Sequence, residues 1–242
     1  MNLGFKDILR TTLNILHLDI TQNLKYDRLT KQIIKRVLLP DSICIDVGAH
    51  KGEILKLFLK SAPNGRHIAF EPIPFLYEAL KTRFTNRCSV FPFALGDESK
   101  ETTFQLVKNA PAYSGVLKRK YAVKHPDVQE ISVLMTTIDY FLITTEKIRL
   151  IKIDVEGGEF AVLKGAEQRL RNDKPYVIFE CGLGASEFYG TTPDQVYDFL
   201  NNEVNLKISL LADWLKEKEP LSRNQFCNYY STNKEYYFLA HP

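Results

Sequence analysis

Acidic side chains recur in this sequence where short apolar runs come to an end. Asp46 lies inside one such run, Glu71, Asp154 and Glu180 close three others, and Asp97 follows a fifth. Carboxylates accept hydrogen bonds from hydroxyl and amine groups and can take up a proton. If the runs are strands of one sheet, these acids gather along a single edge, and solvation alone does not explain such a set. We therefore expect a polar ligand site at that edge.

A glycine turn follows the run that holds Asp46. Gly48 ends the run, Gly52 follows after three residues, and apolar residues at helical spacing resume from Glu53. This order of strand, turn and helix places backbone N–H groups at a helix start, where open α/β sheets commonly bind ligands. The G-x-x-x-G spacing differs from the G-x-G-x-x-G of dinucleotide sites. With Asp46 beside the turn, the sequence favours a cationic or hydroxyl-bearing ligand over a pyrophosphate.

Strand-like runs and helical patterns alternate along the chain. Core strands are expected at residues 43–47, 66–71, 89–95, 149–155, 176–181, 206–211 and 235–240, with an extra strand at 102–107. Pro92 indicates a bulge or an edge position for the third of these. The predicted fold class is α/β, a doubly wound, mostly parallel sheet of about seven strands whose last strand is antiparallel.

The flanking segments suggest how this domain is arranged. Residues 1–40 carry two amphipathic patterns, at 5–16 and 27–39, and form a predicted helical segment packed on the core, in preference to a membrane-surface or dimer role. Residues 41–242 form the predicted single domain. Residues 108–131 interrupt the pattern with prolines, a glycine and clustered basic side chains. This excursion is either a substrate lid, where its charge would favour an anionic acceptor, or a solvated loop.

Composition sets further limits. The chain has 242 residues and a net charge of +3, which does not argue for nucleic acid as a partner. Its four cysteines form no C-x-x-C pair and are expected to be reduced core residues. No stretch approaches the roughly 18 apolar residues of a membrane-spanning helix. A cytoplasmic location is the prediction, with peripheral membrane association and oligomerisation left open.

Four motifs together resemble one known family. They are DVGAHKGE from Asp46, FEP from Phe70, ALGD from Ala94 and KIDVEGGEFAVLKGA from Lys152. Over about residues 41–180 the chain resembles the FkbM family of S-adenosyl-L-methionine-dependent methyltransferases, which have the Rossmann-like class I fold. The resemblance implies that the cofactor contacts Asp46, Gly48, Ala49, Gly52 and Glu53 through its methionine part, Glu71 and Pro72 through its ribose, and Ala94, Leu95, Gly96 and Asp97 near its adenine. It also points to Ser114 and Asp154.

The chemistry of methyl transfer selects the catalytic candidates. Transfer from a sulfonium to oxygen requires in-line placement of the acceptor and removal of a hydroxyl proton. Asp154 is the first candidate for base or orienting group, Glu156 the second and His50 the third. The alternatives are that Asp154 and Glu156 cap the following helix and that His50 is a turn residue bonded to backbone. A metal held by Asp154 with Glu180 is disfavoured, because the sequence shows no histidine beside them and no tight acid cluster.

The expected function is O-methylation of a hydroxyl on a sugar, glycan, glycolipid or other secondary metabolite. Methylation of nitrogen or of a protein is the alternative within enzymes. A nucleotide-binding module without catalysis is a further alternative, against which Glu71 and Asp154 argue. A nicotinamide oxidoreductase is disfavoured by the glycine spacing.

Overall fold

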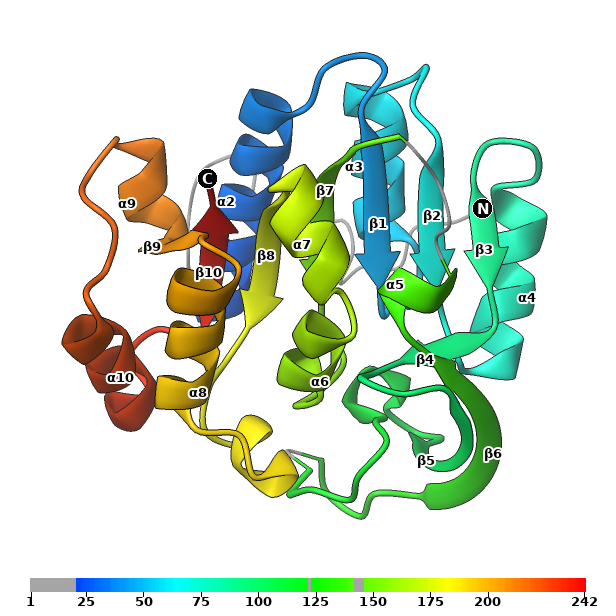
Figure 1. Cartoon of the computed structure of the whole chain (residues 1–242). Coiled ribbons are helices and arrows are strands. Elements are labelled where there is room, and N and C mark those ends of the chain that lie inside the picture. The colour runs from blue at the N-terminus through cyan, green and yellow to red at the C-terminus, as the bar shows by residue number, and fades with distance from the viewer. Residues whose placement is uncertain (1–20, 122, 142–145) are drawn as a thin grey trace.

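The computed structural model describes residues 21–121, 123–141 and 146–242. Its centre is a seven-stranded sheet in the order β3-β2-β1-β7-β8-β10-β9 (Figure 1). The strands are β1 (Ile43–Val47), β2 (His67–Phe70), β3 (Ser89–Phe91), β7 (Ile148–Ile153), β8 (Tyr176–Glu180), β9 (Lys207–Leu210) and β10 (Tyr237–His241). Strand β10 runs antiparallel to β8 and β9, and the other pairs are parallel. The predicted mostly parallel sheet with an antiparallel last strand is confirmed.

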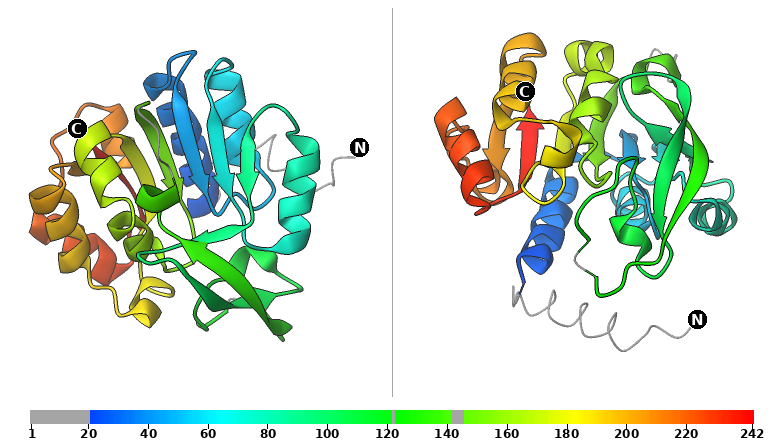
Figure 2. Two further views of the ribbon diagram at one scale, coloured as in Figure 1. Left: turned by 45° about the vertical axis from the view of Figure 1, so that its right-hand side comes forward. Right: turned by 90° about the horizontal axis from the view of Figure 1, so that it is seen from below.

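Helices cover both faces of this sheet (Figures 1 and 2). One face packs against α2 (Gln22–Val37), α3 (Glu53–Ser61), α4 (Pro74–Arg83) and α9 (Leu211–Leu215). The other packs against α5 (Ile138–Phe141), α6 (Glu159–Lys164), α7 (Glu167–Asp173), α8 (Pro193–Asp198) with its π-helical extension Phe199–Glu203, and α10 (Arg223–Thr232). Successive strand residues alternate between the two cores, as Cys44 and Ile45 do, so the central strands need apolar residues on both sides. The fold is doubly wound, as predicted.

A second, three-stranded sheet has the order β4-β6-β5 and corrects two predictions. Its strands are β4 (Phe93–Leu95), β5 (Lys100–Val107) and β6 (Val128–Thr136). Residues 89–95 are therefore not one strand, because Pro92 separates β3 from β4 and the two belong to different sheets. The excursion ends earlier than residue 131, since β6 begins at Val128. In β6, exposed Glu130 and Ser132 alternate with buried Val133 and Met135, the pattern of a half-buried strand, which the predicted elements leave out.

The N-terminal part of the described chain packs on the core. Helix α2 starts at Gln22, behind Thr21, whose hydroxyl caps it by accepting the N–H of Leu24. Its apolar stripe, including Leu29 and Ile33, is buried in the same cluster as strand residues of the large sheet. The helix predicted at residues 5–16 lies outside the described residues. No described helix is long and apolar enough to cross a membrane.

Candidate functional site

The turn after β1 is held tightly between its two neighbouring strands. The N–H groups of Gly48 and Ala49 both donate to the carbonyl of Phe70 at the end of β2, at 3.0 and 3.1 Å. Gly48 has φ +77°, and a Cβ there would lie 2.0 Å from the carbonyl oxygen of Asp154 after β7. Only glycine fits this approach. The turn therefore joins the carboxyl ends of β1, β2 and β7, the edge at which the sequence placed the acids.

Glu71 binds directly to this turn. Its Oε2 accepts the N–H of His50 at 2.7 Å, and its Oε1 accepts the N–H of Ile73 at 2.9 Å. Burial raises the pKa of Glu71 to about 7, against the opposing effect of these two hydrogen bonds. Pro72, the next residue, leads into α4. A carboxylate has further lone pairs beyond the two used here, so Glu71 can still accept from a ligand hydroxyl.

Asp46 is a buried carboxylate with an unsatisfied oxygen. The residue is 1% exposed, and its Oδ2 has no hydrogen-bond partner among the described residues. It lies opposite Lys152 in the β1–β7 register. Burial raises the pKa of Asp46 to about 7, and the nearby Lys152 ammonium opposes that rise. An orphaned buried acceptor is costly unless a ligand satisfies it, which makes Asp46 a candidate contact for a polar or cationic group.

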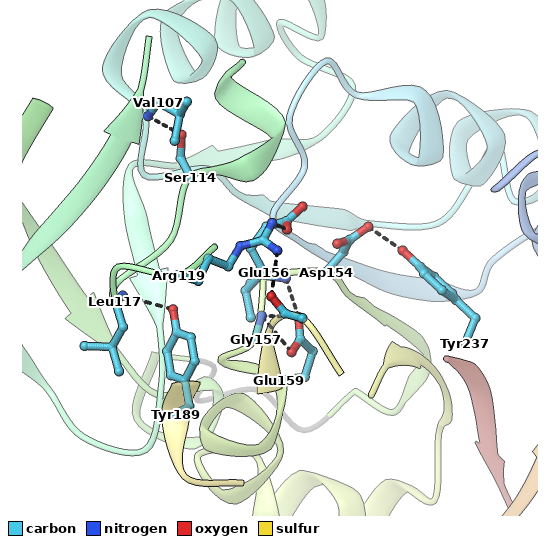
Figure 3. Close-up of polar contacts among 12 residues, drawn as sticks. Val107, Ser114, Leu117, Arg119, Asp154, Glu156, Gly157, Glu159, Tyr189 and Tyr237 are labelled. Atoms are coloured by element: carbon cyan, nitrogen blue, oxygen red, sulfur yellow. Dashed lines mark hydrogen bonds and ion pairs between the residues drawn. The ribbon is translucent and has the colours of Figure 1, made fainter. Parts of the chain in front are cut away.

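Asp154 is held by two donors at the tip of β7. Its Oδ2 accepts from Lys152 Nζ at 2.7 Å and from the Tyr237 hydroxyl at 2.6 Å. Figure 3 shows Tyr237 on one side of Asp154 and Arg119 with Glu156 on the other. Burial would raise the pKa of Asp154, but the Lys152 charge and the two hydrogen bonds outweigh it and lower that pKa. Asp154 therefore stays ionised, and its Oδ1 carries neither of these bonds.

Glu156 is engaged by the excursion loop. It has φ +61° and forms an ion pair with Arg119, whose side chain is 9% exposed (Figure 3). Arg119 also donates to the carbonyl of Gly184, at 3.3 Å, in the loop after β8. The N–H of Leu117 donates to the Tyr189 hydroxyl at 3.0 Å. The excursion, with its short 3₁₀ turn Pro111–Tyr113, is thus fastened to the strand tips and to the 3₁₀ turn Ser186–Tyr189.

The capping alternative for Asp154 and Glu156 finds no support within the described residues. Helix α6 has Gly158 at its N-cap, with no side-chain cap bond there. A third acid, Glu159, organises the loop instead. Its carboxylate accepts the N–H groups of Val155 and Gly157 at 2.9 to 3.2 Å (Figure 3). Glu159 is therefore a structural acid that holds the loop carrying the two catalytic candidates.

His50 contacts the site through its backbone. Its φ is +46°, and its N–H is the donor to Glu71. Burial lowers the pKa of the His50 ring, with the Lys51 charge acting in the same direction. The imidazole is therefore neutral near pH 7. This bond runs from the His50 backbone to a carboxylate, so the alternative that the His50 ring bonds to backbone stays a prediction.

The remaining predicted cofactor residues have contacts elsewhere. Ala94 and Leu95 are buried in β4, and Gly96 donates its N–H to Thr136 of β6. Three other side chains complete the set: Asp97 pairs with Lys164 of α6, Ser114 accepts the N–H of Val107, and Glu53 is exposed in the first turn of α3. The structure thus brings together Asp46, the glycine turn, His50, Glu71, Asp154 and Glu156. Contact of Asp97 with adenine stays a prediction.

Lys152 of β7 and Tyr237 of β10, which both contact Asp154, were not singled out as site residues. Lys152 interrupts an otherwise apolar strand run, and a buried lysine needs a partner, so its position was a usable signal. Nothing in the sequence pairs Tyr237 with Asp154, because that contact depends on β10 inserting beside β8. Glu180 also lies there, and burial raises its pKa well above the usual value, with the charge of Asp154 adding to the effect. Within the described residues, no three His, Cys, Asp or Glu side chains are grouped to hold a metal ion.

Comparisons with known proteins identify the family. The family described as "Methyltransferase FkbM domain" matches residues 46–206, more than half of the chain. A relative from Pseudomonas aeruginosa, "AMB antimetabolite synthetase AmbE", is 26% identical over 218 residues, covering 75% of this chain and 10% of that protein. The chain thus spans about a tenth of that relative's length.

A solved structure agrees with the fold. The crystal structure of methyltransferase FkbM from Methylobacillus flagellatus KT superposes with a TM-score of 0.51 at 16% identity, covering 98% of this chain and 59% of that one. This likeness shows a shared fold. Membership of this methyltransferase family implies that S-adenosylmethionine is the methyl donor. By its match to the family, the chain belongs to the FkbM methyltransferases.

Proposed function

We propose that this methyltransferase transfers the methyl group to a hydroxyl oxygen of a small molecule or glycan, in the class of sugars, glycolipids and secondary metabolites. The observation that carries the proposal is Asp154. Its carboxylate is kept ionised beside the glycine turn, and its Oδ1 is not used by Lys152 or Tyr237. An ionised carboxylate is a hydrogen-bond acceptor suited to a hydroxyl group that is about to lose its proton.

The residues at the edge of the sheet fit S-adenosylmethionine. The unpartnered oxygen of Asp46 suits the amino group of the methionine part, and Glu71 suits the ribose hydroxyls. The close approach at Gly48 leaves the turn's backbone free of side-chain bulk. When bound, the cofactor supplies an electrophilic methyl carbon. We include Ala49, Gly52 and Pro72 in this proposed binding region because they belong to the same turn and strand end.

In the proposed reaction the chain aligns the acceptor, takes up its proton and holds the excursion in place. The acceptor oxygen must be aligned with the carbon–sulfur bond, and Oδ1 of Asp154 is proposed to orient its hydroxyl. An oxygen–carbon bond forms as the carbon–sulfur bond breaks, and the hydroxyl proton passes to Asp154 and then to solvent. Glu156 is tied to Arg119, and we propose that it holds the excursion in place and takes no proton.

The rim of the site supports an acceptor with an apolar part. Leu117 of the excursion and Leu183 and Phe188 of the loop after β8 are all more than 40% exposed. The two loops are joined by bonds from Leu117 to Tyr189 and from Arg119 to Gly184. A rim of exposed apolar side chains beside the proposed hydroxyl contact suits an acceptor that carries both hydroxyl and apolar groups. The AmbE relative, an antimetabolite synthetase, lends support to the secondary-metabolite class.

The test is methyl transfer from labelled S-adenosylmethionine to a panel of sugars, glycolipids and hydroxylated metabolites, with the methylated atom identified by mass spectrometry and NMR. Asp154→Asn is expected to lower kcat by about 100-fold, a typical loss for an acid–base group. Asp127→Asn, which removes an exposed acid from a surface ion pair, is the control. Methyl groups found on nitrogen, or an Asp154→Asn variant as active as the control, would contradict the proposal.

We include a cytoplasmic location in the proposal. Its support is that Cys44, Cys88, Cys181 and Cys227 are all free thiols, two of them buried. Fractionation of the producing cell with an antibody to the chain checks this location, and recovery in an extracellular fraction would contradict it.

A further inference from the structure

The strand tip beside the glycine turn holds a lysine and a tyrosine that share one carboxylate oxygen. Lys152 precedes Asp154 by two residues and so lies on the same face of the chain as it leaves β7. Its side chain is 7% exposed and its Nζ lies 5.4 Å from the centroid of the Tyr237 ring. Both groups donate to Oδ2 of Asp154. Two groups, one from β7 and one from β10, therefore fix one carboxylate.

The two donors on Oδ2 of Asp154 also fix the direction of its other oxygen, Oδ1. A carboxylate bound at Oδ2 by an ammonium and a hydroxyl cannot rotate about its side-chain torsion without breaking both bonds. Burial and the Asp154 charge raise the pKa of Tyr237 well above its usual value, so its hydroxyl remains a donor at any working pH. Oδ1 is thereby left in one orientation, on a residue whose backbone carbonyl packs against Gly48 of the turn.

Helix α2 supports this arrangement from behind. The ring of Tyr26 stacks on that of Tyr237, with centroids 5.0 Å apart. The Tyr26 hydroxyl donates to Glu235 at 2.6 Å and accepts the N–H of Tyr236 at 3.1 Å. The start of β10 is thus fixed on two sides, and the Tyr237 hydroxyl has little freedom to leave Asp154.

We propose that Lys152 and Tyr237 are positioning residues that keep the Asp154 carboxylate charged and direct its Oδ1 toward the acceptor. This inference rests on the proposed role of Asp154 in the reaction. The surroundings make the support necessary, because most charged groups that face Asp154 are acids: Asp46 from β1, Glu180 from β8 and Glu159 from α6. The His50 charge lowers the pKa of Asp154. The Arg119 charge lowers the pKa of Glu180. Lys152 is the cation in direct contact.

The variants Lys152→Met and Tyr237→Phe test this inference. Lys152→Met keeps the length and apolar packing of the side chain but removes the charge, so burial and the acidic neighbours should move the Asp154 titration upward by at least about one pH unit. Tyr237→Phe removes one hydrogen bond and should move it less, in the same direction. The matched controls are Lys218→Met, which breaks an exposed ion pair with Asp213, and Tyr197→Phe, which removes a hydroxyl bonded to Leu221.

Two readouts separate this inference from the proposed function. The first is the carboxyl carbon titration of Asp154 by NMR in the free protein, assigned with Asp154→Asn and needing no activity. The second is the pH profile of kcat, where Lys152→Met should bring an acid limb to higher pH while the KM for S-adenosylmethionine stays within about threefold. An Asp154 titration unchanged in both variants overturns the inference even if the wild type transfers methyl groups. If Lys152→Met does not fold, Tyr237→Phe decides alone. A wild type without methyl transfer contradicts the proposed function, while the NMR titration still decides the inference.

Discussion

At the scale of single residues, the acids of the site differ in pKa because their surroundings differ. Burial raises the pKa of Asp46 and of Glu71 to about 7, whereas the lysine and tyrosine contacts lower that of Asp154. The carboxylates at one sheet edge are therefore in different protonation states near neutral pH. Such a division fits the proposed roles, in which Asp154 stays charged toward the acceptor while Asp46 and Glu71 contact the cofactor.

His50 gives the first prediction. Because its N–H bonds Glu71 and its φ is positive, we expect the backbone to matter and the ring to be dispensable. His50→Asn preserves a residue type that tolerates this conformation. It should keep kcat within about threefold of wild type and leave the pH profile unchanged. Steady-state kinetics across pH check this, and a loss of kcat comparable to that of Asp154→Asn would instead make His50 the base.

The sequence predicted that acids gather at this sheet edge but not what holds them. Asp46, Glu71 and Asp154 could be assigned because each sits at the end of an apolar run followed by glycine or proline. The bonds that fix Asp154 come from Lys152 and from Tyr237, which is 83 residues away in sequence. Contacts between distant strands depend on sheet order, and no local pattern encodes them.

At the scale of elements, the excursion is bonded both to the loop after β8 and to Glu156 beyond the end of β7. Strong apolar runs made the strands of the large sheet predictable, while β6 was missed because its half-buried alternation is a weaker signal than a continuous apolar run. The basic character of the excursion suggested an anionic acceptor. The structure shows that Arg119 pairs with Glu156. Its charge is therefore used within the protein, to dock the excursion on the site.

Tyr189→Phe tests this docking. The change removes the acceptor for the Leu117 N–H and should weaken the attachment of the excursion by about 1 kcal/mol. We expect the KM for the methyl acceptor to rise by about fivefold, with the affinity for S-adenosylmethionine unchanged. Steady-state kinetics with the acceptor as variable substrate measure this. Tyr140→Phe, at a side chain that is 73% exposed, is the control, and equal acceptor KM values in the two variants would contradict the docking role.

At the scale of the whole molecule, the site lies where one sheet edge, the excursion and the helices meet. We propose that residues 41–242 form the methyltransferase domain and that residues 1–40 form a helical segment packed on it, since α2 buries its apolar stripe in the core and stacks Tyr26 on Tyr237. Folding of this domain brings several carboxylates into low-dielectric surroundings. Because of that burial, the stability of the whole domain depends on pH.

The free energy of unfolding should fall as pH rises from 6.5 to 8.5. Burial raises the pKa of Asp46, Glu71 and Glu159 to about 7, so the folded state binds more protons than the unfolded state between their ordinary values and about 7. The stability from these bound protons is present at low pH and is lost as pH rises through 7, at about 1 kcal/mol per group across this window. His50, His67 and His241, whose pKa values burial lowers, act in the opposite direction, because the unfolded state is partly protonated at these residues at pH 6.5; this offset is smaller, about 0.4 kcal/mol per group. Urea unfolding at the two pH values measures the change, and higher stability at pH 8.5 would contradict it.

The most direct test of the account is the affinity of the free protein for S-adenosylmethionine, measured by calorimetry at pH 8 for wild type, Glu71→Gln and the exposed control Glu78→Gln. Glu71 is charged at this pH and is proposed to hold the ribose hydroxyls, so the account predicts binding by the wild type and control and at least about tenfold weaker binding by Glu71→Gln. Equal affinities in all three proteins, or no binding of S-adenosylmethionine by the wild type, would contradict the assignment of the cofactor to this turn.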